Sequence, residues 1–191
     1  MLLDAAMKLL DERDAAHITM PEVAATAGLD DGQIGDDFAD VDDLMDHAIV
    51  HRFSRHVDDA AAAISGILAA SNTVDEARML LQGVTRFTQT TGRSVQRMQR
   101  IEAIARTRTS ARLRAMIASE QHRLNRSYAE LVVTFKERGW LREQVDPLAL
   151  GLFLQAYTLG RVLDDISEER VDAEAWNRLI DIVMDSLLPV D

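Results

Sequence analysis

The chain of 191 residues contains no cysteine. This absence excludes a disulfide framework, a thiol nucleophile and every metal site with cysteine ligands. No apolar run reaches the roughly eighteen residues that span a bilayer, and the first segment, MLLDAAMKLLDERD, is charged where a signal peptide is apolar. We therefore expect a cytoplasmic protein with no membrane partner.

Motifs for common enzyme chemistry are also missing. The sequence has no glycine-rich phosphate loop, no G-x-S-x-G segment and no H-E-x-x-H segment. Asp43, His47 and His51 follow one another at four-residue spacing and would share one helix face, but no further histidine or cysteine is placed to complete a metal site. We expect no enzymatic activity, no cofactor and no metal.

Basic residues are scarce in the first quarter of the chain. Residues 1–50 contain 13 Asp and Glu but only Lys8 and Arg13, whereas residues 51–191 contain 19 residues of each sign. The first quarter therefore holds the whole net charge of -11. Because adaptation to high salt would acidify the entire surface, this uneven distribution indicates a local role.

The pattern that is present is helical. Apolar residues recur every three or four positions and no segment alternates like a strand, which predicts an all-α fold. A first helix is expected over residues 2–13, and a capping box at Thr19 with Pro21 begins a second, which ends at Gly28. Asp30 is expected to cap a third helix over residues 30–37, and Asp40 a longer fourth one.

Similar signals mark the helices of the later chain. Capping or breaking residues occur at Thr73 to Glu76, Thr91-Gly92, Thr109-Ser110, Gly139, Asp146-Pro147, Asp172 and Pro189. The helix that begins at Pro147 is expected to run to about Ile166. No linker rich in proline or glycine interrupts the chain, so we expect a head of residues 1–45 joined directly to a body of residues 46–191.

The first fifty residues resemble the helix-turn-helix part of the TetR family of bacterial transcription regulators. The similarity lies in LLDAAMKLLDER, in ITMPEVAATAGL, and in Gly28, Gly32, Ile34, Phe38 and Leu44. The rest of the chain is similar only in the number and length of its helices and around Trp176 and Leu187-Leu188. The resemblance implies a three-helix head on a larger body, about nine helices in all, and a homodimer.

In that family the third helix enters the major groove, and Lys, Tyr and His side chains around it contact phosphates. The matching positions here are Asp31, Gln33, Gly35, Asp36, Asp37 and Val41, of which only Gln33 suits a base edge. Helix capping accounts for aspartates at helix starts, but not for Asp36 and Asp37 at a helix end. We therefore expect an intact head that does not bind an operator conventionally, because duplex DNA is densely negative.

The body offers a candidate ligand pocket. Apolar and aromatic side chains expected to line it, or else to be plain core, are Phe87, Met98, Ile101, Met116, Tyr128, Phe135, Phe153 and Tyr157. From Arg93 to Arg126 there are nine arginines against two glutamates. These arginines are either a solvated face or a surface that recognises an anionic ligand or an acidic partner.

The last two helices carry more apolar residues than one buried face needs. The resemblance implies that they form a four-helix dimer interface with a second copy. The residues expected there are Leu152, Leu159, Val162, Ile180, Met184 and Leu187, with Leu179, Val183 and Leu188 in the same apolar series.

The resulting hypothesis is a TetR-like homodimer that senses a small apolar or anionic ligand and acts in transcriptional regulation without conventional operator binding. One alternative is an ordinary DNA-binding repressor that a ligand releases. Another is a protein-interaction module, in which the acidic head mimics DNA and occupies the basic head of another regulator, or pairs with that regulator as an inactive heterodimer.

Overall fold

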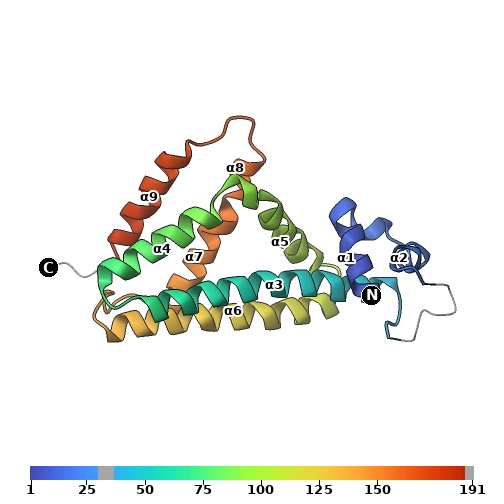
Figure 1. The fold of residues 1–191 in the computed structure, drawn as a ribbon, viewed down its shortest axis with the longest axis horizontal. Helices are drawn as coiled ribbons and strands as arrows, with labels where there is room; N and C mark the ends of the chain where they lie inside the picture. The colour runs from blue at the N-terminus through green and yellow to red at the C-terminus, as the bar shows by residue number, and fades with distance from the viewer. Residues whose placement is uncertain (30–36, 188–191) are drawn as a thin grey trace. The chain divides into compact units, whose positions relative to one another are not determined.

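A computed structural model describes residues 1–29 and 37–187. All regular secondary structure in these residues is helical, as predicted (Figure 1). The helices are α1 (Leu2–Glu12), α2 (Met20–Ala27), α3 (Val41–Ala70), α4 (Val74–Thr88), α5 (Ser94–Arg106), α6 (Ala111–Glu137), α7 (Pro147–Gly160), α8 (Val162–Asp165) and α9 (Ala173–Asp185), with short 3-10 turns at Ala15–His17 and Thr91–Arg93.

Local hydrogen bonds explain where the helices begin and end. The Glu22 carboxylate accepts the backbone N–H of Thr19 at 2.9 Å, and Gly28 ends α2 with a φ of 71°, a left-handed conformation that favours glycine. Asp40 accepts the N–H of Asp43 at 2.7 Å at the start of α3. The predicted caps of α4, α7 and α9 are also confirmed, with Thr73, Asp146 and Asp172 as the capping residues.

Two of the predicted helices are not found as predicted in the described residues. The helix predicted from Pro147 to about Ile166 is interrupted at Arg161, because Gly160 is a weak helix former and the Arg161 side chain is buried. The third helix predicted over residues 30–37 falls on residues outside the described part of the chain, apart from Asp37, which is exposed in a turn. That helix stays a prediction.

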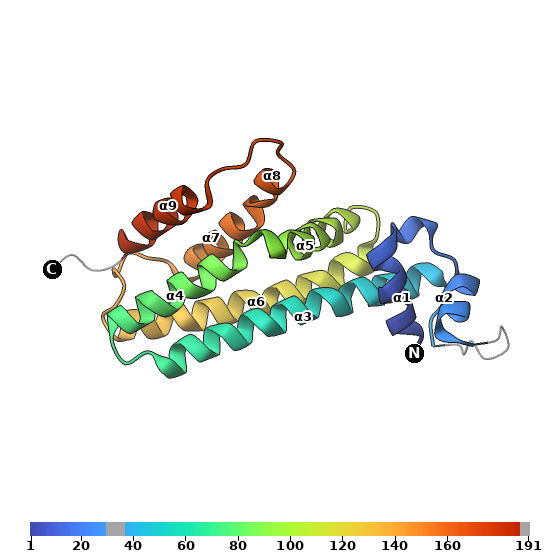
Figure 2. The ribbon, with the colours of Figure 1, turned by 45° about the horizontal axis from the view of Figure 1, so that its top comes forward.

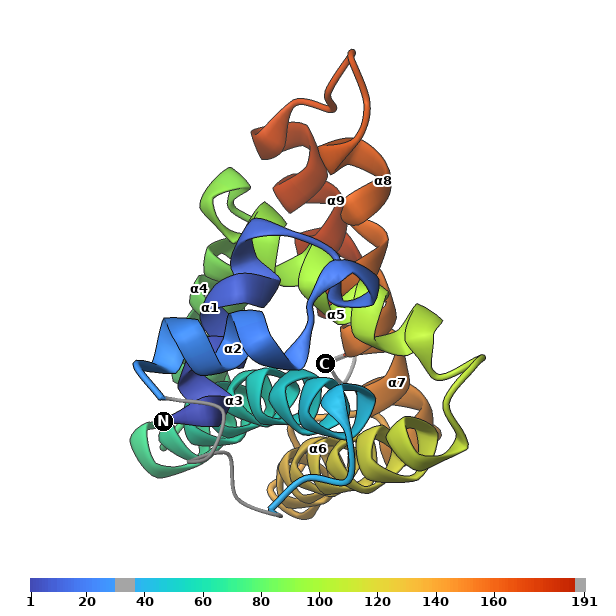
Figure 3. The ribbon, with the colours of Figure 1, turned by 90° about the vertical axis from the view of Figure 1, so that its right-hand side faces the viewer.

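The chain forms two compact units, and α3, α5 and α6 each contribute to both. The first comprises Met1–His56 and Ala103–Glu120. In it α1 and α2 lie together beside the first part of α3 (Figure 3). Its core side chains are fully buried or nearly so: Leu9, Val23, Leu44, Met45 and Leu113.

The second unit comprises Val57–Glu102 and Gln121–Asp191, and here the ends of α3 and α6 run side by side beneath α4, α7 and α9 (Figure 2). Its core includes Ile64, Leu131, Phe135, Leu150 and Leu154. Helices α6 and α7 approach closely at Gly151, where an added Cβ would lie only 2.8 Å from the Cβ of Tyr128. None of the helices in the described ranges is long and apolar enough to cross a membrane.

Candidate functional site

A buried carboxylate in the first unit is held by residues from the start of α6. Asp46 is 2% exposed, and its Oδ2 accepts hydrogen bonds from Ser110 Oγ at 2.8 Å and Arg112 Nε at 3.2 Å. Nη1 of Arg112 also lies 3.1 Å from Asp43. The backbone N–H of Ala39, followed by the charge of Arg112, lowers the pKa of Asp43.

The two charge blocks of the sequence therefore meet inside this unit. Arg112 pairs with the acidic first quarter, and Arg106 Nη1 lies 3.8 Å from Asp14. The unit contains fourteen acidic residues against eight basic ones, a net charge of -6 compared with -11 for residues 1–50. Arginines thus neutralise part of the acidic excess, while Asp37, Asp40 and Asp42 remain exposed.

Most of the expected DNA-facing positions, namely Asp31, Gln33, Gly35 and Asp36, lie outside the described residues. Val41 is half-buried at the first position of α3. His47 packs edge-on against Phe38, with ring centroids 5.5 Å apart, and its Nδ1 is 3.3 Å from Asp43. His51 is exposed, and the described residues include no group of three His, Asp or Glu placed to hold a metal.

Buried polar side chains cross the second unit between α6 and α7. Gln155 is 4% exposed, and its Nε2 donates to Asn125 Oδ1 at 2.9 Å and to the Gly151 carbonyl at 3.1 Å. Its Oε1 accepts a hydrogen bond from Gln121 Nε2 at 2.6 Å. Because each of these amides finds partners, the network fixes the register of the two helices.

Two tyrosines from the predicted pocket are half-buried in this unit. The hydroxyls of Tyr157 and Thr85 are 2.9 Å apart, and burial raises the pKa of both Tyr157 and Tyr128. Burial lowers the pKa of Arg100, and the positive charge of Arg100 offsets part of the rise in the pKa of Tyr128. This polar group is suited to orienting the head of a small molecule.

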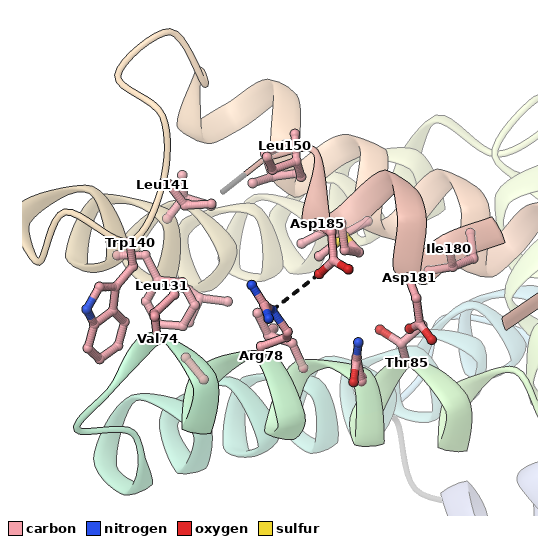
Figure 4. Close-up of a pocket in the computed structure, with 18 residues that line it drawn as sticks. Val74, Arg78, Thr85, Leu131, Trp140, Leu141, Leu150, Ile180, Asp181 and Asp185 are labelled. Carbon is pink, nitrogen blue, oxygen red and sulfur yellow. Dashed lines mark ion pairs between the residues drawn. The ribbon is translucent and has the colours of Figure 1, made fainter. Parts of the chain in front are cut away.

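A cavity opens between α4 and α9, over a floor formed by α6 and α7 (Figure 4). Its volume is about 40 Å³. The walls are almost entirely apolar, and charged groups stand at Arg78, Asp181 and Asp185. The principal lining residues are Ala77, Leu81, Leu131, Phe135, Trp140, Leu150, Leu154, Ile180 and Met184.

The predicted pocket residues are dispersed. Phe135 lines the cavity, whereas Phe153 lies against Tyr157 with ring centroids 5.6 Å apart. Phe87 is 56% exposed beneath the guanidinium of Arg93. Met98 and Ile101 are half-buried on α5, and Met116 is half-buried in the first unit. Their role as ligand contacts stays a prediction.

Sequence reasoning did not single out the charged cavity residues. Arg78 lies on α4, and Asp181 and Asp185 lie four residues apart on α9. The i, i+4 spacing places these two aspartates on one helix face, but it does not tell a cavity-lining face from a solvated one.

The residues expected at a dimer interface fall into two groups. Leu152 is 63% exposed, and Leu159 and Val162 are half-buried. Ile180, Met184 and Leu187 instead line the cavity of their own chain. The large apolar side chains that α7, α8 and α9 present outward are Leu148, Leu152, Phe153, Leu163, Leu179 and Ile182.

Comparison with known proteins relates this architecture to a class of regulators. No family model matches the chain, and no curated protein matches it. A solved structure of a protein assigned to the TetR family from Mesorhizobium loti has a TM-score of 0.72 at 15% identity, over 97% of this chain and 92% of that one.

Two further structures show the same similarity. The fatty acid degradation regulator FadR from Bacillus halodurans has a TM-score of 0.65 at 16% identity, over 96% of this chain and 95% of that one. The ketosteroid transcriptional regulator KstR2 of Mycobacterium tuberculosis has a TM-score of 0.58 at 18% identity, over 99% and 94%. The fold is therefore that of the all-helical transcription regulators. More narrowly, it is the TetR fold.

Proposed function

We propose that the protein is a TetR-like homodimer that senses a small apolar or anionic ligand and acts in transcriptional regulation without conventional operator binding. The observation that carries this proposal is the combination of a TetR fold with a first unit of net charge -6. A dimer would present two such negative units to a negative duplex, where phosphate contacts require an excess of cations.

The ligand is proposed to bind in the second unit. An apolar cavity lined in part by Thr85 is present there, together with half-buried tyrosine and buried amide groups. Two proteins of similar fold carry names that refer to fatty acid degradation and to ketosteroids, and both classes of compound have a large apolar body. Apolar walls with a few polar groups are typical of small-molecule sites.

The dimer is proposed to form through the outward faces of α7, α8 and α9. Leu152 on α7, Leu163 on α8 and Ile182 on α9 are 63%, 72% and 67% exposed in the single chain. Exposed apolar groups that lie together favour a protein interface. In this arrangement Leu179 and Ile182 replace the cavity-lining Ile180 and Met184 as the α9 contacts.

A second candidate function is an acidic protein-interaction module. Asp37, Asp40 and Asp42 are exposed within six residues of one another, at the point where the chain enters α3. Such a surface suits the basic head of another regulator, as a DNA mimic or in an inactive heterodimer.

A gel-shift assay with genomic fragments at low salt tests the proposal. We expect no shifted band, because the first unit lacks the cation excess that phosphate contacts need. A specific, salt-sensitive complex with one fragment would instead establish an ordinary ligand-released repressor. A mixture with a purified basic regulator of the same fold distinguishes the interaction module, which would prevent that regulator from shifting its own operator.

A further inference from the structure

Helix α9 is attached to α4 by three side-chain contacts along its length. Trp176 Nε1 donates to Gln89 Oε1 at 3.2 Å near the start of α9, and Arg86 Nη2 donates to Asp181 Oδ2 at 2.8 Å. Near the end of α9, Arg78 Nε lies 3.2 Å from Asp185 Oδ1. The helices therefore run antiparallel, and the cavity is lined on its two sides by Arg78 and Thr85 of α4 and by Asp181 and Asp185 of α9 (Figure 4).

These contacts differ in strength. Gln89 is 6% exposed and Trp176 is half-buried, so their contact is partly shielded from water. The side chains of Arg78 and Asp185 are 39% and 52% exposed, although the Nε of Arg78 is itself buried and makes no hydrogen bond within the described structure. Because water readily replaces an exposed ion pair, the carboxyl end of α9 is the end that can separate from α4.

The charges at the mouth select against anions. At the mouth Asp75, Asp181 and Asp185 stand against Arg78 and Arg86, and each of these two arginines is already paired with a carboxylate. An anionic head group would have to displace a carboxylate from Arg78 and then lie beside the carboxylates that remain. An uncharged molecule with an apolar body meets no such repulsion and matches the apolar walls.

The cavity is too small to hold a ligand of ordinary size unless a helix moves. Its volume of about 40 Å³ is far below that of ordinary small-molecule pockets, which begin at roughly 300 Å³. A ligand with more than a few heavy atoms therefore fits only if α9 moves away from α4.

We propose that this cavity binds uncharged apolar molecules such as a medium-chain alcohol, and that the pairs Arg78–Asp185 and Arg86–Asp181 form a clasp that opens to admit them. The inference rests on the ligand sensing proposed above, and it names the site and the charge of the ligand. The contact between Trp176 and Gln89, near the start of α9, acts as the hinge of this movement.

Paired ligands of equal chain length test the charge selection. 1-Octanol and octanoate are titrated at neutral pH below the micelle concentration, and the melting temperature and the fluorescence of Trp140, a lining residue, are followed. Octanol is expected to bind at least about tenfold more tightly than octanoate, because the mouth carries an excess of carboxylates. Equal or tighter binding of octanoate would overturn the inference.

Substitutions in the clasp test the site itself. The double variant Asp181→Asn, Asp185→Asn removes the carboxylates from the mouth and is expected to bring octanoate to within about threefold of octanol. Glu168→Gln with Glu169→Gln is the matched control, because it also removes two carboxylates but at exposed residues that do not line the cavity, and its selectivity should equal that of the parent. The assignment of selection to the mouth is wrong if both variants respond alike.

A cavity-filling variant separates binding in the cavity from binding elsewhere. Leu81→Trp places an indole in the cavity and should abolish the response to octanol while the helical content is retained; if that variant does not fold, Val74→Phe fills the same cavity from its end. Undiminished octanol binding by a folded variant would overturn the inference. If neither octyl compound binds the parent but other compounds do, the assignment of the ligand to this cavity is wrong and the ligand-sensing proposal stands. If no compound in a broad library binds, both proposals are wrong.

Discussion

Arg97 and Asp165, 68 positions apart in the sequence, form a two-pronged ion pair between α5 and α8. Arg97 Nε donates to Asp165 Oδ2 and Nη2 to Oδ1, both at 2.7 Å, with side chains only 4% and 8% exposed. Nη1 of Arg97 also donates to the carbonyls of Thr88 and Thr90. One guanidinium thus joins the end of α4, the start of α5 and α8.

Breaking this pair should be costly. Asp165→Asn leaves the buried guanidinium of Arg97 without its counter-charge, and we expect the free energy of unfolding to fall by about 3 kcal/mol. Urea denaturation followed by circular dichroism measures the change. Glu174→Gln is the control, because it makes the same chemical change in the exposed pair with Arg178 and should cost less than about 1 kcal/mol. Similar costs for the two variants would contradict the prediction.

The same pair predicts a dependence on pH. The hydrogen bonds from Arg97 hold the pKa of Asp165 below its ordinary value of 3.8. Because the folded-state pKa is the lower one, the stabilisation is present above pH 3.8 and is lost as the pH falls through the lowered pKa. The stability difference between the parent and Asp165→Asn should therefore shrink when urea denaturation is repeated below pH 3.8. A difference that stays constant down to pH 2 or so, or grows, would show that the ionised carboxylate is not what stabilises the protein.

Sequence reasoning succeeded where the structure depends on neighbours in the chain. The capping box of Thr19 and the turn at Gly28 set the ends of α2 through bonds between residues a few positions apart, so the local pattern was sufficient. The pair of Arg97 and Asp165 depends on a tertiary contact that no local pattern encodes.

The face of α9 shows the same limit. Ile180 and Leu179 are adjacent, both are apolar, and the sequence could not rank them. The structure turns Ile180 into the cavity at 5% exposed and Leu179 outward at 52%. Which apolar stripe is buried is decided by the packing of α4, α6 and α7 rather than by the helix itself.

The sequence shows an acidic block and an arginine-rich block, but it does not show which groups either block contacts. The arginines from Arg93 onward suited a solvated face, an anionic ligand or an acidic partner. At least four of them pair with acidic residues of the same chain, and two of these, Arg106 and Arg112, pair with residues of the acidic first quarter. The fold brings residues 103–120 against the first quarter, which is information that composition does not contain.

Arg112 should therefore matter for stability. Arg112→Gln removes the cation beside the buried Asp46, and we expect a loss of about 2 kcal/mol, because the buried carboxylate then keeps its bond from Ser110 but loses the charge-assisted one from Arg112. Arg108→Gln, at an exposed arginine of the same unit, is the control and should change stability by less than about 0.5 kcal/mol. Adding Asp46→Asn to Arg112→Gln should recover part of the loss, and a purely additive double variant would show that the two residues are not coupled.

The dimer proposal predicts that charged substitutions on the proposed surface convert the dimer into a monomer. Light scattering should give the parent the mass of a dimer at micromolar concentration, whereas Leu152→Asp combined with Ile182→Asp should give a monomer, because charges would be buried at the apolar interface. Met79→Asp is the control at a residue that is 65% exposed on α4, outside the proposed surface, and it should remain a dimer. If the parent protein has the mass of a monomer, the dimer proposal is wrong.

Restoring the family's phosphate-contacting residues tests why the head is acidic. Asp31→Lys, Gly35→Tyr, Asp36→His and Asp37→His together change the charge by +4 per chain and +8 per dimer with neutral imidazoles. Asp37 is exposed, and the other three residues lie outside the described part of the chain. If the head otherwise retains the TetR fold, the variant should acquire DNA binding, measured by fluorescence anisotropy with a labelled duplex across a range of salt concentrations.

The salt dependence identifies the mechanism. Because each phosphate contact contributes about 0.9 to the slope of log affinity against log salt, the restored head should bind with a steep slope, and the parent should show no binding. Glu168→Lys with Glu169→Lys gives the same change of +4 in the second unit and is the matched control, which should stay inactive if position rather than net charge governs binding. If the parent itself bound a duplex at nanomolar affinity in about 150 mM salt, the aspartates would not be replacing DNA contacts, and the protein would be an ordinary repressor with an unusual docking mode.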